Sequence, residues 1–196
     1  MKRPVPDELL LGLIKAQPAH GYELLDRFKS KSDLSRIWTM STSQLYAVLK
    51  RLEEDGLIVG QQVAVSDAPS RNKYAITTEG DRKLNTWLYD SNPSSSIHRI
   101  RVIFLSKLYI AILLELPFED IIEHQKTACI TQRNEFLNER KQTQSQLEGL
   151  VLDFIISQLD SALNWLEICY DTLSPNQSRV SNVVLKCDDN TKSNIT

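Results

Sequence analysis

The sequence predicts a mainly α-helical protein with one small β-hairpin, in which a compact N-terminal domain precedes a region of long helices. Three observations support this fold class. Apolar residues recur at helical spacing in several short segments before residue 90, and only residues 57–77 alternate as strands do. The stretch DSNPSSS at 90–96 then has the composition of a linker. We therefore divide the chain into residues 1–90, a linker at 91–96, a helical region at 97–173 and a tail at 174–196.

Composition and charge are those of an ordinary soluble protein. The 196 residues are 41% hydrophobic and 24% charged, with a formal net charge of −2, which argues against a strongly basic, histone-like protein. Residues 1–90 carry 13 Lys/Arg and 12 Asp/Glu, whereas the remainder carries 10 and 13, so the first part is the better candidate to face an anion. Three widely spaced cysteines and no signal peptide predict a reduced, cytoplasmic protein. The apolar run Leu108–Leu114 is too short to span a membrane, so we expect no membrane association.

Two helices are predicted at the start of the chain. Asp7–Gln17 begins with two acidic residues, which the helix dipole favours there, and carries one leucine- and isoleucine-rich face. Pro18 ends this helix. After a short turn, a second helix is expected to direct Tyr22, Leu25 and Phe28 inward.

The third predicted helix is the best defined. Ser41 followed three residues later by Gln44 fits a capping box, in which each side chain satisfies a free backbone N–H at the helix start. Gly56 fits the left-handed residue that ends such a helix. The apolar positions recur at i, i+3, i+4 and i+7 and should face the core: Leu45, Val48, Leu49 and Leu52.

A hairpin and a fourth helix follow. Leu57–Val65 and Asn72–Thr77 read as two strands joined by a turn at residues 66–71. Thr77 or Thr78 is expected to cap a helix through Leu88. Three short helices followed by a hairpin give the order of a winged helix-turn-helix, because the helices share a small core and the hairpin covers its open side.

The second half is expected to form long helices. Ile97–Leu116 is strongly apolar, and Pro117 begins another helix whose residues 131–146 are too polar to be stable alone. Beyond residue 147 the apolar positions are spaced 4-3-4-3-4, as in a coiled-coil seam. We expect this seam to join two copies of the chain, the alternative being an intramolecular bundle. The predicted dimerisation residues are Ile155, Leu159, Ala162, Leu166, Cys169 and Leu173. The tail 174–196 has almost no apolar periodicity and is expected to be disordered.

The polar face of the third helix suits DNA. A helix N-terminus offers unpaired N–H groups and about half a positive charge to a phosphate. Gln side chains bond base edges, and Lys or Arg side chains bond phosphates. Two cations near the hairpin tip, Arg71 and Lys73, suit phosphates as well. The alternative for each residue alone is an ordinary solvated surface. The candidate DNA-binding residues are Ser41, Thr42, Ser43, Gln44, Tyr46, Ala47, Lys50, Arg51, Arg71 and Lys73.

Three segments in this order resemble the PadR family of bacterial transcription regulators. They are LLGLI…HGYELLDRF (10–28), SQLYAVLKRLEEDGLI (43–58) and RNKYAITTEG (71–80). The resemblance implies a homodimeric, ligand- or signal-responsive regulator, most often a repressor, that binds double-stranded DNA at an inverted repeat. It also favours a DNA contact for Tyr46, which the apolar pattern leaves equally open to a core position. Family wings often carry Gly beside the Arg, whereas this turn reads APSR (68–71), so the wing contact is less well supported than the helix contact.

The remaining motifs narrow the function. No phosphate-binding glycine loop, nucleophile–base arrangement or metal-ligand spacing is found, so we expect neither an enzyme nor a cofactor or metal site. His20 is expected to cap or pack at its turn. Trp38, Trp87 and Trp165 are candidates to line a pocket for an unidentified small-molecule effector, although tryptophans more often lie in the core. The second hypothesis is a winged-helix protein-interaction module that acts through its helical C-terminal region, because Glu53–Asp55 make the third helix less basic than an ideal DNA reader.

Overall fold

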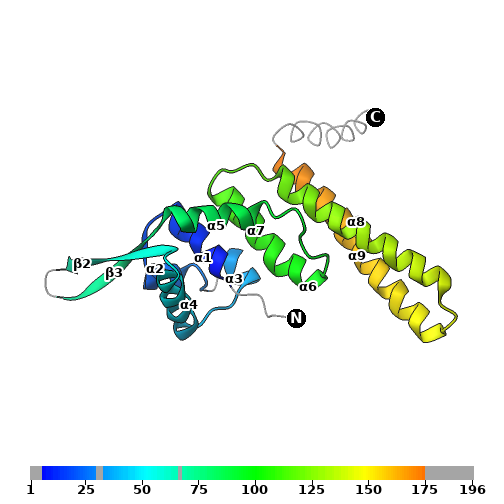
Figure 1. The fold of residues 1–196 in the computed structure, drawn as a ribbon, viewed down its shortest axis with the longest axis horizontal. Coiled ribbons are helices and arrows are strands. Elements are labelled where there is room, and N and C mark those ends of the chain that lie inside the picture. Colours follow the sequence, from blue (N-terminus) through cyan, green and yellow to red (C-terminus); the bar gives the residue numbers. More distant parts are fainter. Residues whose placement is uncertain (1–5, 30–32, 66–67, 175–196) are drawn as a thin grey trace, which may run out of the picture.

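The computed structural model describes residues 6–29, 33–65 and 68–174, and the predicted tail therefore lies almost entirely outside the described residues. Its elements are arranged as an elongated molecule, with a β-hairpin at one end and a long helical hairpin at the other (Figure 1). The predicted fold class is confirmed: helices dominate, the sheet is small and the C-terminal helices are long. The elements of the first part are α1 (Asp7–Ala16), β1 (Ala19–His20), α2 (Gly21–Asp26), α3 (Asp33–Ile37), α4 (Thr42–Glu54), β2 (Ile58–Val65), β3 (Ala68–Ile76) and α5 (Thr78–Leu88).

The N-terminal core gathers the apolar faces of α1, α2, α3, α4 and α5. Leu10, Ile14 and Leu49 are completely buried there. The predicted inward face of α2 needs one correction, because Tyr22 is 44% exposed and Leu24 is buried in its place. The helix α3 was not predicted, since its five residues carry one deeply buried apolar side chain, Leu34, and too little periodicity to be recognised.

The sheet contains three antiparallel strands in the order β1-β3-β2. Ala19 and His20 pair with Tyr74 and Lys73, so the segment expected to be only a turn adds a short strand to the hairpin. Strand β3 starts at Ala68, four residues before the predicted start, and the predicted turn is correspondingly shorter.

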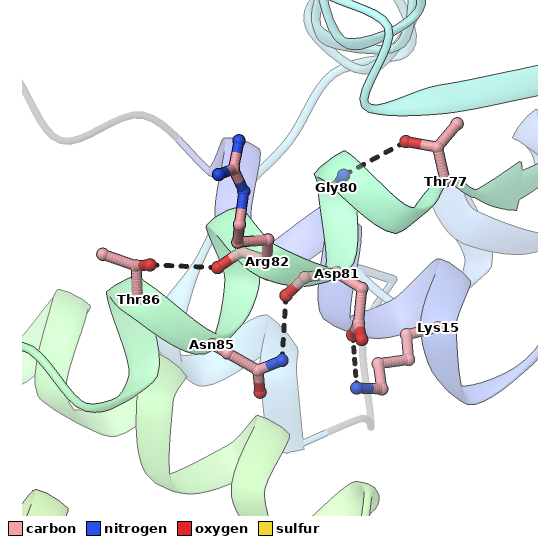
Figure 2. Close-up of polar contacts among 7 residues, drawn as sticks. All are labelled: Lys15, Thr77, Gly80, Asp81, Arg82, Asn85 and Thr86. Atoms are coloured by element: carbon pink, nitrogen blue, oxygen red, sulfur yellow. Dashed lines mark hydrogen bonds and ion pairs between the residues drawn. The ribbon is translucent and has the colours of Figure 1, made fainter.

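Helix α5 begins at a capped turn that packs against the root of the hairpin. The Thr77 hydroxyl oxygen accepts a hydrogen bond from the Gly80 N–H at 3.1 Å, as predicted for a helix cap (Figure 2). A Cβ atom at Gly80 would lie 2.0 Å from the Leu57 carbonyl oxygen, so only glycine permits this close approach. One turn further, Asp81 forms an ion pair with Lys15 of α1 (Figure 2).

The apolar helix predicted at 97–116 is a continuous run of three segments: α6 (Ile97–Arg99), the π-helical segment η1 (Ile100–Phe104) and α7 (Leu105–Leu113). Helix α7 packs on α1 and α5 rather than standing apart, and Ile110 and Ala111 are completely buried. A hydrogen bond of 2.8 Å from Trp38 Nε1 to the Ser106 hydroxyl also ties α7 to the loop before α4. Residues on both sides of the predicted linker therefore share one hydrophobic core.

The long helices α8 (Glu119–Gln142) and α9 (Gln146–Leu173) form an antiparallel hairpin. Three ion pairs at seven-residue steps join them: Lys126–Glu167 at 2.7 Å, Arg133–Asp160, and Arg140–Asp153 at 2.9 Å. A shift of α9 by one turn would break all three pairs together, so the basic side of α8 and the acidic side of α9 favour a single register.

The predicted dimerisation residues lie mainly inside one chain. Leu159, Ala162 and Leu166 are buried in the protomer, whereas Ile155, Cys169 and Leu173 are half-buried. Near the start of α9, Leu147, Leu150, Val151 and Phe154 are 72%, 67%, 50% and 63% exposed, and near its end Ile168 and Tyr170 are also exposed. We call the first four residues the α9 apolar face.

Within the part of the chain that the structure describes, no helix combines the length and the apolar character needed to cross a membrane.

Candidate nucleic-acid interface

The first turn of α4 presents a polar, exposed surface. The Ser41 hydroxyl oxygen accepts from the Gln44 N–H, and the Gln44 side-chain oxygen accepts from the Ser41 N–H at 2.9 Å, which confirms the predicted capping box. Ser41, Thr42, Ser43 and Gln44 are all exposed, while Leu45 beneath them is completely buried. The cap engages the Gln44 amide oxygen, so the Nε2 group is left to donate to an acceptor on a base edge.

The sequence predicts the same role, a phosphate contact, for Lys50 and Arg51, but the structure gives their side chains different partners. The Lys50 side chain is 77% exposed and pairs with Glu54 only loosely, at 3.7 Å, so its ammonium group is available to a phosphate. The Arg51 guanidinium instead donates to both carboxylate oxygens of Asp7 in α1, at 3.0 Å from Nε and 2.5 Å from Nη2. This hydrogen-bonded carboxylate raises the pKa of Arg51. Arg51 therefore fastens α4 to α1.

Tyr46 lies on the surface of α4, with its side chain 47% exposed. Its ring lies close to the start of α2, since a Cβ atom at Gly21 would lie 2.8 Å from the Tyr46 hydroxyl. Beside it, His20 stacks on Tyr22 with ring centroids 5.5 Å apart, and His20 Nδ1 lies 3.0 Å from the Asn72 carbonyl oxygen. His20 thus packs at its turn as predicted, and this aromatic surface joins α4 to the hairpin.

The hairpin places its polar residues next to this surface. Lys73 and Asn72 on β3 are exposed, and so are their partners Gln61 and Gln62 on β2. Arg71 lies on β3 opposite Val63, but its side chain is outside the described part of the structure. Among the ten candidate DNA-binding residues, Arg51 is half-buried. The candidates that are exposed to solvent are Ser41, Thr42, Ser43, Gln44, Tyr46, Ala47, Lys50 and Lys73.

The acidic C-terminal end of α4 contacts the start of the hairpin. Glu53 accepts a hydrogen bond of 3.0 Å from the Gly60 N–H at the start of the hairpin. Gly56, with φ of 68°, ends the helix in the left-handed conformation as predicted. The Glu53–Gly60 hydrogen bond therefore links the C-terminal end of α4 to the start of the hairpin.

Two cavities lie beside α6 and η1. One, of about 470 Å³, is lined by residues of α3, α4, α6 and η1, including Trp38. The other, of about 640 Å³, is a nearly apolar groove between α6–η1 and α9 that includes Trp165. Arg101 lines both cavities. Trp87 instead lies under the ammonium group of Lys107, 5.8 Å from the ring centre, so the three tryptophans do not share one pocket.

Sequence reasoning did not find three of the residues at these sites. Asp7 is 44 positions from its partner Arg51, and no local pattern indicates such a pair. Arg36 and Arg101 belong to short or apolar segments, where a single cation gives no signal. Among the described residues, no group of three His, Cys, Asp or Glu side chains is arranged to hold a metal ion.

The first part of the chain is similar in sequence to known proteins. Residues 10–86 match the model of the transcriptional regulator PadR-like family. The negative transcriptional regulator PadR of Bacillus subtilis is 29% identical over 84 residues, which are 43% of this chain and 45% of that protein, so the match spans less than half the length of the relative. Crystal structures of Bacillus subtilis PadR with operator DNA and with p-coumaric acid are both 21% identical, with TM-scores of 0.43 and 0.41. They cover 86% and 88% of this chain and 98% of each solved chain.

The matched segment runs from within α1 through most of α5, and so includes α4 and the hairpin whose geometry is described above. Residues 10–86, less than half of this chain, are therefore similar to the transcriptional regulator PadR-like family.

Proposed function

We propose that this protein is a sequence-specific, DNA-binding transcriptional regulator that acts as a homodimeric repressor on an inverted-repeat operator in the cytoplasm. The observation that carries the proposal is the exposed, capped N-terminus of α4, which lies beside an exposed hairpin in a domain of a regulator family. In this proposal Gln44 reads a base edge, while Lys50, Lys73 and the serine and threonine hydroxyls of α4 bind phosphates. Tyr46 and Ala47 complete the surface.

The dimer is proposed to form through the second half of the chain. The α9 apolar face supports this, because four large apolar side chains on successive turns remain exposed in a single protomer. A two-fold axis would pair this face with its copy. Two α4 helices held about 34 Å apart would then meet one face of the duplex, so the operator should contain two half-sites about one helical turn apart.

A small-molecule effector is part of the proposal, because the cavity of about 470 Å³ lies between α3 and α4 of the DNA-binding part and the segment α6–η1. A ligand that favours one arrangement of these parts would shift the fraction of protein able to bind DNA. The complex of Bacillus subtilis PadR with p-coumaric acid shows that a relative binds a small molecule.

Selection of bound sites from a random DNA library tests the function. The expected result is a palindromic site whose affinity falls steeply with salt, because phosphate contacts release counterions. The sharpest variant is Gln44→Glu, which keeps an oxygen acceptor for the capping box and removes the amide donor that faces the DNA. The matched control is Gln142→Glu at the exposed end of α8. Gln44→Glu should weaken binding to the selected site at least tenfold and change the preferred base, whereas the control should not. Failure to enrich any sequence would refute the proposal.

A protein-interaction module remains the second candidate. The α9 apolar face favours it, since an exposed apolar surface of this kind also suits a different protein. An intact dimer without DNA affinity in 50 mM salt would support this candidate over the first.

A further inference from the structure

The cavity between α3, α4 and η1 is unusually rich in cations. Its volume is about 470 Å³, within the range of small-molecule sites. Three arginines from three different elements line it: Arg36 of α3, Arg51 of α4 and Arg101 of η1. No Asp or Glu side chain is among its lining residues. Such a lining attracts an anion and repels a cation.

The charges of these arginines are only partly neutralised. Arg51 is paired with Asp7, which lies behind the cavity wall and cancels one charge. Arg36 and Arg101 are exposed, and within the described residues neither forms an ion pair. Two uncompensated guanidinium groups therefore face one space. A dianion matches them better than a monoanion does, and the planar guanidinium fork fits the oxygens of a phosphate.

Part of the lining of the same cavity is apolar. Ile37, Trp38, Met40 and Val48 contribute to it, and the Trp38 ring is held in place by its hydrogen bond to Ser106. A bare phosphate ion would leave this apolar surface in contact with water. A flat apolar body attached to the acid group would cover it, at about 25 cal/mol for each Å² removed from water.

We infer that this cavity binds a phosphate monoester carried on a flat apolar group, with the phosphate between Arg36 and Arg101 and the apolar body over Trp38 and Val48. At pH 7 a phosphate monoester carries a charge of about −1.5 to −2, which matches the two free guanidinium groups.

A ligand bound in this cavity would also contact residues of the proposed DNA-binding surface. Gln44, Ala47 and Val48 of α4 line the cavity, and the first two are candidate DNA contacts. A ligand there would touch the same helix face as the operator, so ligand and DNA should weaken each other's binding by an equal factor. This consequence rests on the proposed function, whereas ligand binding itself does not.

The test is calorimetric titration of the full chain, without DNA, with four probes: phenyl phosphate, inorganic phosphate, benzoate and phenol. Phenyl phosphate should bind tightest, because it alone supplies both a dianion and an apolar body. Arg36→Gln and Arg101→Gln should each weaken it about tenfold or more, the typical effect of one charge-assisted hydrogen bond. The matched control is Arg82→Gln on α5, which lies outside the cavity and should bind as the unmodified protein does. Unchanged thermal melting verifies that each variant is folded.

Three results would overturn the inference. The first is that benzoate binds as tightly as phenyl phosphate, since this would remove the need for a dianion. The second is that both cavity variants retain full affinity, which would place the probe elsewhere. The third is that no probe binds at millimolar concentration. A loss of DNA affinity in the two variants would then assign the arginines to DNA phosphates. Because the titration contains no DNA, its result can be interpreted even if the operator selection fails.

Discussion

Lys50 and Arg51 are neighbours in the sequence, and the structure predicts opposite consequences for their replacement by alanine. Lys50 is 77% exposed with one loose partner, so Lys50→Ala should change the free energy of unfolding by less than about 0.5 kcal/mol. If its ammonium group binds one phosphate, the slope of log K against log salt should become shallower by about 0.9. Between 50 and 200 mM salt, the affinity of the variant should therefore fall roughly threefold less than that of the unmodified protein.

Arg51→Ala should instead lower the stability of the fold and leave the salt dependence of DNA binding unchanged. It leaves Asp7 without its partner, and the Asp7 side chain is only 11% exposed. An unpaired buried polar group costs about 1–3 kcal/mol. Because the Arg51 side chain is itself 43% exposed, we expect the lower part of this range, about 1–2 kcal/mol. The salt slope of DNA binding should not change.

Two measurements on the same samples separate these effects: urea unfolding for stability, and fluorescence anisotropy of a labelled operator at four salt concentrations for the slope. The single variant Asp7→Ala and the double variant Asp7→Ala/Arg51→Ala complete a cycle, and a favourable coupling energy of about 1 kcal/mol is expected. The reasoning is refuted if Arg51→Ala leaves stability unchanged and makes the slope as shallow as Lys50→Ala does. Arg51 would then contact DNA, as the sequence suggested.

Three further predictions concern stability and assembly. Gly80→Ala should destabilise the fold by about 1–3 kcal/mol, because its Cβ would meet the Leu57 carbonyl oxygen, and chemical denaturation measures the loss. Burial lowers the pKa of Lys107, so the folded protein binds fewer protons than the unfolded chain between that lowered pKa and the ordinary one, and stability should rise with pH in this window. Lys107→Met should remove that pH dependence and raise stability at pH 7 by roughly 1 kcal/mol, as thermal melts across pH would reveal. Leu150→Asp should yield folded monomers in sedimentation experiments, whereas Leu166→Asp should unfold the protein; a stable Leu150→Asp dimer would show that the α9 apolar face is not the interface.

Local chemistry accounts for what could be predicted along α4. The capping box of Ser41 and Gln44, the buried stripe and the left-handed Gly56 all depend on residues within a few positions of one another. The same holds for the Thr77 cap of α5. Periodicity also correctly predicted that Ser41–Gln44 face solvent, since the opposite side of that helix must be buried.

The errors share a physical cause, which is that the partner of a side chain lies far away in the sequence. Periodicity favoured Tyr22 as a core residue, but Tyr22 is exposed and stacks on His20, which in turn contacts the Asn72 carbonyl oxygen 52 residues away. The short strand β1 exists only because β3 is there to pair with it.

The sequence by itself determined the hairpin, the caps of α4 and α5 and the solvent-facing side of α4, because caps, turns and apolar periods are properties of short segments. Only the tertiary structure decided that Arg51 is committed to Asp7, that α9 buries Leu159 and Leu166 within its own chain, and that Arg36 and Arg101 line one cavity. Each of these outcomes depends on which helices lie side by side. Packing of whole apolar faces decides that arrangement, and a linear pattern of residues does not contain it.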